Sequence, residues 1–211
     1  MAADEKLGAP SASAQVSSGS EIILTAKSDP TGGAPTCASD TEVSGSSTFT
    51  FRSPVAQDGH AITRLIAECP PLDTNSAYCN LLQCSDFAET CIVAERNGCI
   101  EGWISGYRPP SAPERLFVWQ VAVHASARGE GLAGRMLDWL LARPACAGVT
   151  MLTTTITQDN AASWALFGAF ARRHGAQLTK APRFERDTHF GGAHATEWEA
   201  RITPISSPIT S

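Results

Sequence analysis

Residues 116–134 read LFVWQVAVHASARGEGLAG, and this stretch decides the fold of the chain. Its first part, residues 116–123, is almost entirely apolar, which predicts a strand buried on both faces. The glycine-rich part that follows leads into apolar residues at helical spacing, namely Leu132, Met136, Leu137, Leu140 and Leu141. The stretch therefore predicts a buried strand, a tight turn and an amphipathic helix in direct succession.

On both sides of this unit, short strands and helices follow one another. Upstream we expect a helix that has Asp58 as its N-cap and ends before Pro70, followed by a helix that begins near Asn75 or Ser76 with Tyr78, Leu81 and Leu82 on one face. Strands over 90–96 and 99–107 should then be joined by a hairpin turn at Asn97-Gly98. Downstream we expect a strand over 149–156, a helix over 160–174 and strands over 177–178 and 196–202. This order indicates an α/β or α+β domain built on a mixed sheet.

The composition excludes several classes of protein. The formal net charge is −5 and no basic run occurs, which argues against nucleic acid as the main partner. No stretch approaches the roughly 18 consecutive apolar residues that a membrane span needs. The seven cysteines are scattered without a Cys-x-x-Cys pair, so they indicate neither a disulfide framework nor a zinc site. We expect a cytoplasmic protein without a bound metal.

The ends of the chain differ from its centre. Residues 1–48 are dominated by Ser, Ala, Gly, Thr and Pro and contain no aromatic residue. Such a segment buries too little apolar area to offset the entropy of ordering it, which predicts a disordered tail. We expect one catalytic domain over 49–205 and a short C-terminal tail over 206–211.

The glycines at 129, 131 and 134 permit two interpretations. They spell G-x-G-x-x-G, the dinucleotide-binding fingerprint, but that fingerprint needs a strand running directly into the first glycine and an acidic residue about 20 positions later. Here residues 124–128 intervene, and residues 149–155 contain no carboxylate. The same turn also fits R-x-x-G-x-A, in which small residues and a helix N-terminus let backbone N–H groups approach phosphates.

Arg128, Gly131 and Ala133 match the pyrophosphate-binding signature of the Gcn5-related N-acetyltransferase (GNAT) superfamily, which this stretch resembles. Residues 159–167, DNAASWALF, resemble the superfamily's N-x-x-A-x-x-L-Y helix, with Phe167 where the tyrosine usually stands. The substitution removes the usual proton donor to the departing thiolate. The resemblance implies the superfamily fold, a mixed and mostly antiparallel central sheet flanked by helices, and acetyl-CoA as cosubstrate.

Further blocks resemble a narrower family, the diaminobutyrate acetyltransferases; they lie at 70–78, 104–107, 117–123, 153–157, 159–164 and 191–194. This resemblance covers about residues 49–205. It implies acetylation of the γ-amino group of L-2,4-diaminobutyrate, a step toward the osmolyte ectoine, by a homodimer. Its small-molecule partners would be the diamino acid and acetyl-CoA.

We expect the coenzyme in the cleft where the strand over 116–124 splays from the strand over 149–156. The expected contacts are Val121 and Val123 through their backbone groups, Arg128, Gly129, Gly131, Leu132, Ala133, Asn160, Ser163 and Phe167. Arg135, one turn into the helix, would add a charge-assisted contact. A simple helix cap is the alternative role for Asn160.

A diamino acid brings two ammonium groups and one carboxylate, so its site needs carboxylates and a donor. The candidates are Asp73, Tyr78, Trp119, His194 and Glu197. Asp73 could instead cap a turn, Trp119 could be a core residue with Gln120 facing the opposite way, and 194–197 could be a solvated loop. We expect direct attack of the amine, with Glu197, Asp73 or His194 as the base.

Two rival functions remain open at this point. The chain could acetylate another small amine, or it could bind acyl-CoA without catalysis, which the phenylalanine at 167 favours. No cysteine is placed for an acyl-enzyme intermediate.

Overall fold

The computed structural model describes residues 48–70 and 72–205. The helices and strands are β1 (Thr50–Arg52), α1 (Gly59–Ala67), α2 (Ala77–Ser85), β2 (Ile92–Arg96), β3 (Cys99–Tyr107), β4 (Arg115–Val123), α3 (Leu132–Leu141), β5 (Met151–Thr157), α4 (Ala161–Arg173), β6 (Gln177–Phe184), α5 (Arg186–Phe190) and β7 (Glu197–Thr203). The strands form one sheet in the order β1-β2-β3-β4-β5-β7-β6. Among the strand pairs of the described residues, only β4 and β5 run parallel. The prediction of a mixed, mostly antiparallel sheet is confirmed.

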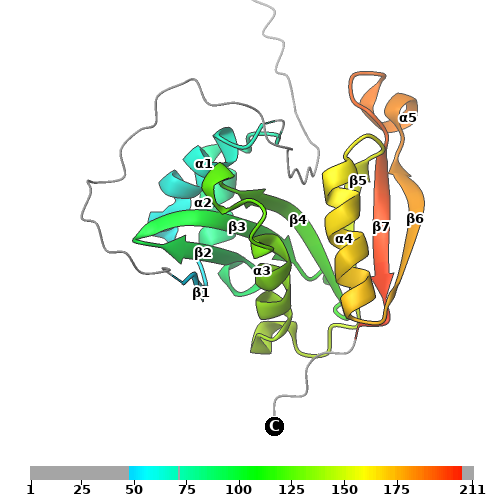
Figure 1. The fold of residues 1–211 in the computed structure, drawn as a ribbon. Helices are drawn as coiled ribbons and strands as arrows, with labels where there is room; N and C mark the ends of the chain where they lie inside the picture. The colour runs from blue at the N-terminus through cyan, green and yellow to red at the C-terminus, as the bar shows by residue number, and fades with distance from the viewer. Residues whose placement is uncertain (1–47, 71, 206–211) are drawn as a thin grey trace, which may run out of the picture.

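Helices cover both faces of the sheet (Figure 1). The larger core lies under α3 and α4, where Val121, Leu137 and Phe167 are buried together. The smaller core lies under α1 and α2, where Ile62 packs with Trp103 of β3. The long apolar strand β4 contributes to both cores, which explains why it reads as apolar on both faces.

The parallel pair β4–β5 is short. Its register covers only residues 115–117 of β4 and 151–153 of β5. Beyond this point β4 stays paired with β3 up to Val123, while β5 stays paired with β7 up to Thr157. The two strands therefore separate toward their carboxyl ends, as Figure 1 shows and as the sequence predicts.

Asp58 is the N-cap residue of α1, as predicted, and the helix begins at Gly59. The Asp58 carboxylate makes no capping hydrogen bond to the helix, however. Instead both carboxylate oxygens accept hydrogen bonds from Arg52, at 2.6 and 2.9 Å. The carboxylate joins the entry of α1 to β1, a strand that the sequence did not predict.

The predicted face of α2 is also wrong. Ser76 does cap this helix, accepting a hydrogen bond from the Cys79 N–H at 3.1 Å. However, Tyr78 and Leu81 are 70% and 41% exposed, and the buried positions are Asn80, Gln83 and Cys84. The Asn80 amide donates to the Thr63 hydroxyl of α1 at 2.9 Å, so a hydrogen bond joins the two helices where an apolar contact was expected.

Other departures are local. Strand β6 runs to Phe184 rather than stopping at 178, and α5 was not predicted. Four cysteines are buried free thiols, as expected for small core residues, whereas Cys99 is disulfide-bonded, which no sequence pattern signalled. The expected tails lie outside the described residues, apart from Thr48. Of the helices described, none has the length and apolar character to cross a membrane.

Candidate functional site

The edge of β4 that faces the separating β5 carries the main-chain groups of Val121 and Val123. The His124 N–H donates to the Glu101 carbonyl of β3 at 2.8 Å, which marks a hydrogen-bonded pair of the antiparallel ladder. Since hydrogen-bonded and non-hydrogen-bonded pairs alternate, the groups of Val123 and Val121 point away from β3. The Val123 carbonyl accepts from Nε of Arg128 at 3.2 Å. The main chain of Val121 is directed at the gap that β5 leaves.

The turn before α3 depends on two glycines in the left-handed region. Gly129 has φ = +85° and Gly131, the N-cap residue of α3, has φ = +69°. A Cβ at either position would meet no atom within 4 Å, so the backbone conformation rather than lack of space requires glycine. The side chains of Leu132 and Ala133 are buried. What this turn presents outward is backbone, including the first N–H groups of α3, which have no partner within the helix.

A charge network holds this turn against the β2–β3 hairpin. Arg96 bonds the Glu101 carboxylate at 2.6 and 3.1 Å and the Glu130 carboxylate at 3.0 Å. The Ser126 hydroxyl donates to Glu101 at 2.8 Å. Burial of Glu101 opposes its ionisation, but the hydrogen bonds from Arg96 and Ser126 outweigh burial and lower its pKa below the ordinary 4.5. Arg135, in contrast, stacks on the rings of Phe49 and Phe51 at the edge of the sheet.

The second helix N-terminus at this end of the sheet belongs to α4. The Asn160 side chain accepts from the Ser163 N–H at 3.0 Å, so Asn160 does cap the helix. Because α3 follows β4 and α4 follows β5, both helices begin at the carboxyl ends of the parallel pair, where open α/β sheets bind ligands. Ser163 and Phe167 are fully buried, and Phe167 packs in the larger core.

A β-bulge in β4 decides where Trp119 points. Gln120 pairs with Ser105 and Val118 with Gly106, so Trp119 is an extra residue. The Trp119 ring contacts Tyr107 with centroids 6.3 Å apart, and the Gln120 amide donates to the Asp73 carbonyl at 3.0 Å. Both side chains therefore lie on the face that carries the segment before α2. The expectation that Gln120 faces the opposite way was wrong, because the extra residue breaks the alternation.

A second bulge lies in β6. Pro182 pairs with Trp198 and Phe184 with Glu197, so Arg183 is the extra residue. The Arg183 guanidinium lies 4.9 Å from the Phe117 ring centroid of β4 and 5.1 Å from that of Phe184. This bulge likewise turns two consecutive side chains toward one face of the sheet, which is the face of Phe117.

Aromatic and guanidinium contacts join the two bulges into one surface. From the C-terminal side, the chain of contacts runs from His194 through Phe190, Phe184, Arg183, Phe117 and Tyr107 to Trp119. The main-chain carbonyl of Asp73 accepts from Gln120, next to Trp119, and Glu197, which is fully buried, is the register partner of Phe184. Four of the five predicted acceptor residues thus lie on or next to this chain of contacts. Tyr78 is exposed on α2 and is not part of this chain of contacts.

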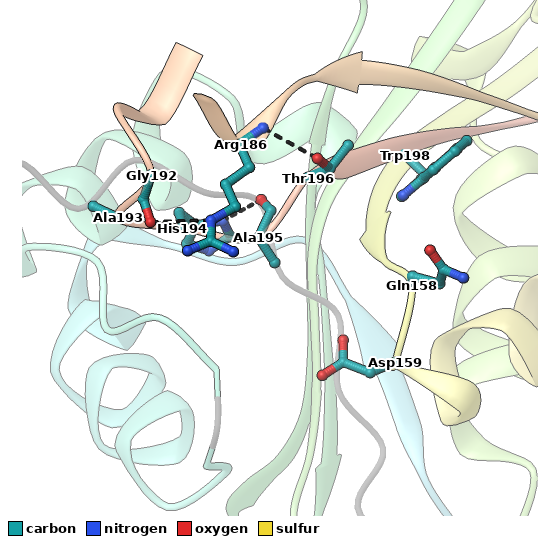
Figure 2. Close-up of a pocket in the computed structure, with 9 residues that line it drawn as sticks. All are labelled: Gln158, Asp159, Arg186, Gly192, Ala193, His194, Ala195, Thr196 and Trp198. Atoms are coloured by element: carbon teal, nitrogen blue, oxygen red, sulfur yellow. Dashed lines mark hydrogen bonds between the residues drawn. The ribbon is translucent and has the colours of Figure 1, made fainter. Parts of the chain in front are cut away.

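A cavity of about 600 Å³ opens beside the carboxyl end of β5 (Figure 2). It is lined by Gln158, Asp159, Arg186, Gly192, Ala193, His194, Ala195, Thr196 and Trp198. The end of β5 and the loop before β7 therefore face one another across it. The His194 Nδ1 lies 2.8 Å from the Ala195 carbonyl, so Nδ1 carries a proton and donates it to this carbonyl.

Sequence reasoning missed Arg183, Arg186 and Trp198. Arg183 reaches β4 only because of a bulge, and the other two line a cavity formed by pairing between distant strands. Among residues 48–70 and 72–205, no three His, Cys, Asp or Glu side chains are grouped to hold a metal ion.

Comparisons with known proteins agree with this geometry. A profile of the acetyltransferase (GNAT) family matches residues 59–171. The L-2,4-diaminobutyric acid acetyltransferase of Vibrio cholerae is 50% identical over 159 residues, which cover 75% of this chain and 91% of that protein. The enzyme of the same name from Methylotuvimicrobium alcaliphilum is 47% identical, covering 75% and 92%.

Among solved structures, the diaminobutyrate acetyltransferase from Paenibacillus lautus, in complex with L-2,4-diaminobutyric acid and coenzyme A, matches with a TM-score of 0.73 and 38% identity. The match covers 77% of this chain and 99% of that one. The chain therefore belongs to the GNAT acetyltransferase family and, within it, to the L-2,4-diaminobutyric acid acetyltransferases.

Proposed function

We propose that this chain transfers the acetyl group of acetyl-CoA to the γ-amino group of L-2,4-diaminobutyrate, giving N4-acetyl-L-2,4-diaminobutyrate for ectoine synthesis. One observation carries the proposal: the phosphate-compatible turn and the connected acceptor residues lie on either side of the point where β4 and β5 separate. The relatives named above, which act on or bind this amino acid, support the choice of acceptor.

The coenzyme half of the site uses backbone groups. The turn at Gly129 and Gly131 and the first N–H groups of α3 suit a pyrophosphate, because a helix N-terminus offers unpaired donors and a partial positive charge. The outward main chain of Val121 suits the pantetheine arm, and its N–H can polarise the thioester carbonyl. Of the predicted coenzyme residues, Phe167 serves this half through packing.

The acceptor half supplies charge. Asp73 and Glu197 can neutralise the two ammonium groups of a diamino acid, and the face of Trp119 can stabilise a cation. We assign the base to Glu197, because its register partner in β5 is Thr157, the last residue of the strand at which the gap is widest. Asp73 and His194 then position the acceptor.

The reaction proceeds by direct attack. Glu197 takes a proton from the γ-ammonium, and the neutral nitrogen attacks the thioester carbonyl carbon. The C–S bond breaks, the new amide nitrogen gives its second proton to water, and water in turn protonates the CoA thiolate, since the phenylalanine at 167 has no acidic proton to give. Direct transfer agrees with the state of the free thiols. Burial raises the pKa of Cys69 and Cys79, raises that of Cys84 and of Cys146 to about 11, and raises that of Cys91 to about 12. Protonated thiols are poor nucleophiles.

Steady-state kinetics across a panel of amines tests the proposal. We expect CoA release to be fastest with L-2,4-diaminobutyrate, and slower with L-ornithine and 1,3-diaminopropane. A preference for 1,3-diaminopropane would point instead to a polyamine acetyltransferase. Tight acetyl-CoA binding without CoA release from any amine would point to a non-catalytic binding module.

We further propose that the catalytic domain spans residues 49–205 and that the enzyme works in the cytoplasm as a homodimer. Five of the six cysteines among the described residues are free thiols, which supports a reducing compartment, whereas the disulfide at Cys99 does not. Sedimentation velocity tests the oligomeric state.

A further inference from the structure

The proposed contacts to the coenzyme and to the two ammonium groups of the acceptor do not use Arg183. It lies in the β6 bulge, next to the register partner of Glu197, and its guanidinium covers the ring of Phe117, two residues before Trp119. Arg183 therefore lies between a carboxylate and an aromatic ring that the proposed function assigns to the acceptor.

The charges around Arg183 do not balance. Its Nη1 lies 3.3 Å from Glu199, but the same carboxylate also receives two hydrogen bonds from Arg201, at 2.7 and 3.1 Å. One carboxylate thus faces two guanidinium groups, and the shorter contacts belong to Arg201. Glu199 alone therefore does not neutralise both arginines, and the Arg183 side chain is 26% exposed.

A buried polar side chain lies on the same face of the sheet as Phe117. Thr153 of β5 pairs with Phe117 on one side and with Arg201 on the other, and its side chain is fully buried. Within the part of the chain that the structure describes, the Thr153 hydroxyl makes no hydrogen bond. A buried hydroxyl of this kind is a donor that a carboxylate can accept from.

We propose that Arg183 binds the α-carboxylate of the acceptor and thereby selects diamino acids over diamines of the same length. The inference rests on the proposed function and adds its specificity-determining residue. The guanidinium lies over the Phe117 ring and its Nη1 donates to Glu199, which leaves the Nε and Nη2 N–H groups for a planar carboxylate, a group that arginine binds bidentately. The ammonium groups would then lie toward Glu197 and Asp73.

The test compares two substrates that differ only in the carboxylate, L-2,4-diaminobutyrate and 1,3-diaminopropane. Arg183→Gln should raise KM for diaminobutyrate by roughly 10- to 100-fold, the usual range for losing a charged hydrogen-bonded pair. KM for 1,3-diaminopropane and kcat for both should change less than about twofold. Arg183→Lys keeps the charge but not the paired N–H donors of the guanidinium, so it should raise KM for diaminobutyrate selectively as well, but by a smaller factor.

Arg201→Gln is the matched control, because Arg201 shares Glu199 but is more exposed. It should leave the ratio of the two KM values unchanged. The proposal is overturned if Arg183→Gln weakens both substrates equally or neither, or if Arg201→Gln reproduces its effect. If the wild-type protein itself fails to acetylate diaminobutyrate, the proposed function fails. Acetyl-CoA affinity and melting temperature show whether each variant folds. If Arg183→Gln does not fold, Arg183→Lys takes its place in the comparison of the two substrates.

Discussion

The two halves of the site are built by different means. The coenzyme half comes from one continuous segment, β4 followed by the Gly129–Gly131 turn and α3, and it presents mainly backbone groups. The acceptor half comes from three separate segments, around Asp73, Trp119 and residues 183–197, and it presents side chains. A contiguous backbone site is readable from local sequence, whereas a side-chain site assembled from distant segments depends on register.

The largest effect that separates the halves should come from Glu197. If it is the base, Glu197→Gln should lower kcat by roughly 10²- to 10⁴-fold while leaving acetyl-CoA affinity unchanged. Asp73→Asn and His194→Gln should mainly raise KM for the acceptor. The pH dependence of kcat for the three variants checks the assignment. Glu197→Gln alone should lose the fall of kcat at acidic pH. If Asp73→Asn or His194→Gln alone loses it instead, that residue is the base and the assignment to Glu197 is wrong.

A smaller effect should come from Gly131. An alanine there is strained by the positive φ, at a cost of roughly 1–2 kcal/mol in stability, and it should weaken acetyl-CoA binding about 10-fold by moving the backbone donors. Gly148→Ala is a matched control, because Gly148 also has positive φ, +76°, and open space around a Cβ. Calorimetry should show weaker acetyl-CoA binding for Gly131→Ala alone. Equal acetyl-CoA affinity of the two variants would show that the turn is not part of the coenzyme site.

The smallest effect concerns the network that holds this turn. Because the pKa of Glu101 is lower in the folded chain than its ordinary 4.5, its stabilising contribution is complete above that value and is lost as pH falls through the folded pKa. Melting temperatures between about pH 7 and about pH 3 should therefore fall less steeply for Glu101→Gln than for the wild type. Glu114→Gln, at an exposed position, should follow the wild type. Parallel curves for all three proteins would show that Glu101 is not coupled to folding.

Sequence reasoning succeeded where a function depends on local backbone. The strand at 116–123, the turn at Gly131 and the cap at Asn160 all lie where the pattern placed them. These features need only apolar periodicity, glycine at positive φ and a side chain that accepts from a helix N-terminus. Long-range pairing does not enter any of them.

It failed where a function depends on pairing between strands. Nothing in the residues around Trp119 reveals the bulge that places Trp119 and Gln120 on one face, because a bulge exists only relative to β3. Arg183 was missed for the same reason, since its bulge is defined against β7. The buried face of α2 was misread because Asn80 is held by a hydrogen bond to α1 rather than by apolar contacts.

The most direct test of the central claim is the structure of the product. Purified protein, acetyl-CoA and L-2,4-diaminobutyrate should yield a single product whose acetyl group NMR places on N4, with one CoA released for each acetyl group transferred. An acetyl group on N2, a mixture of both positions, or no product at saturating acetyl-CoA would contradict the account.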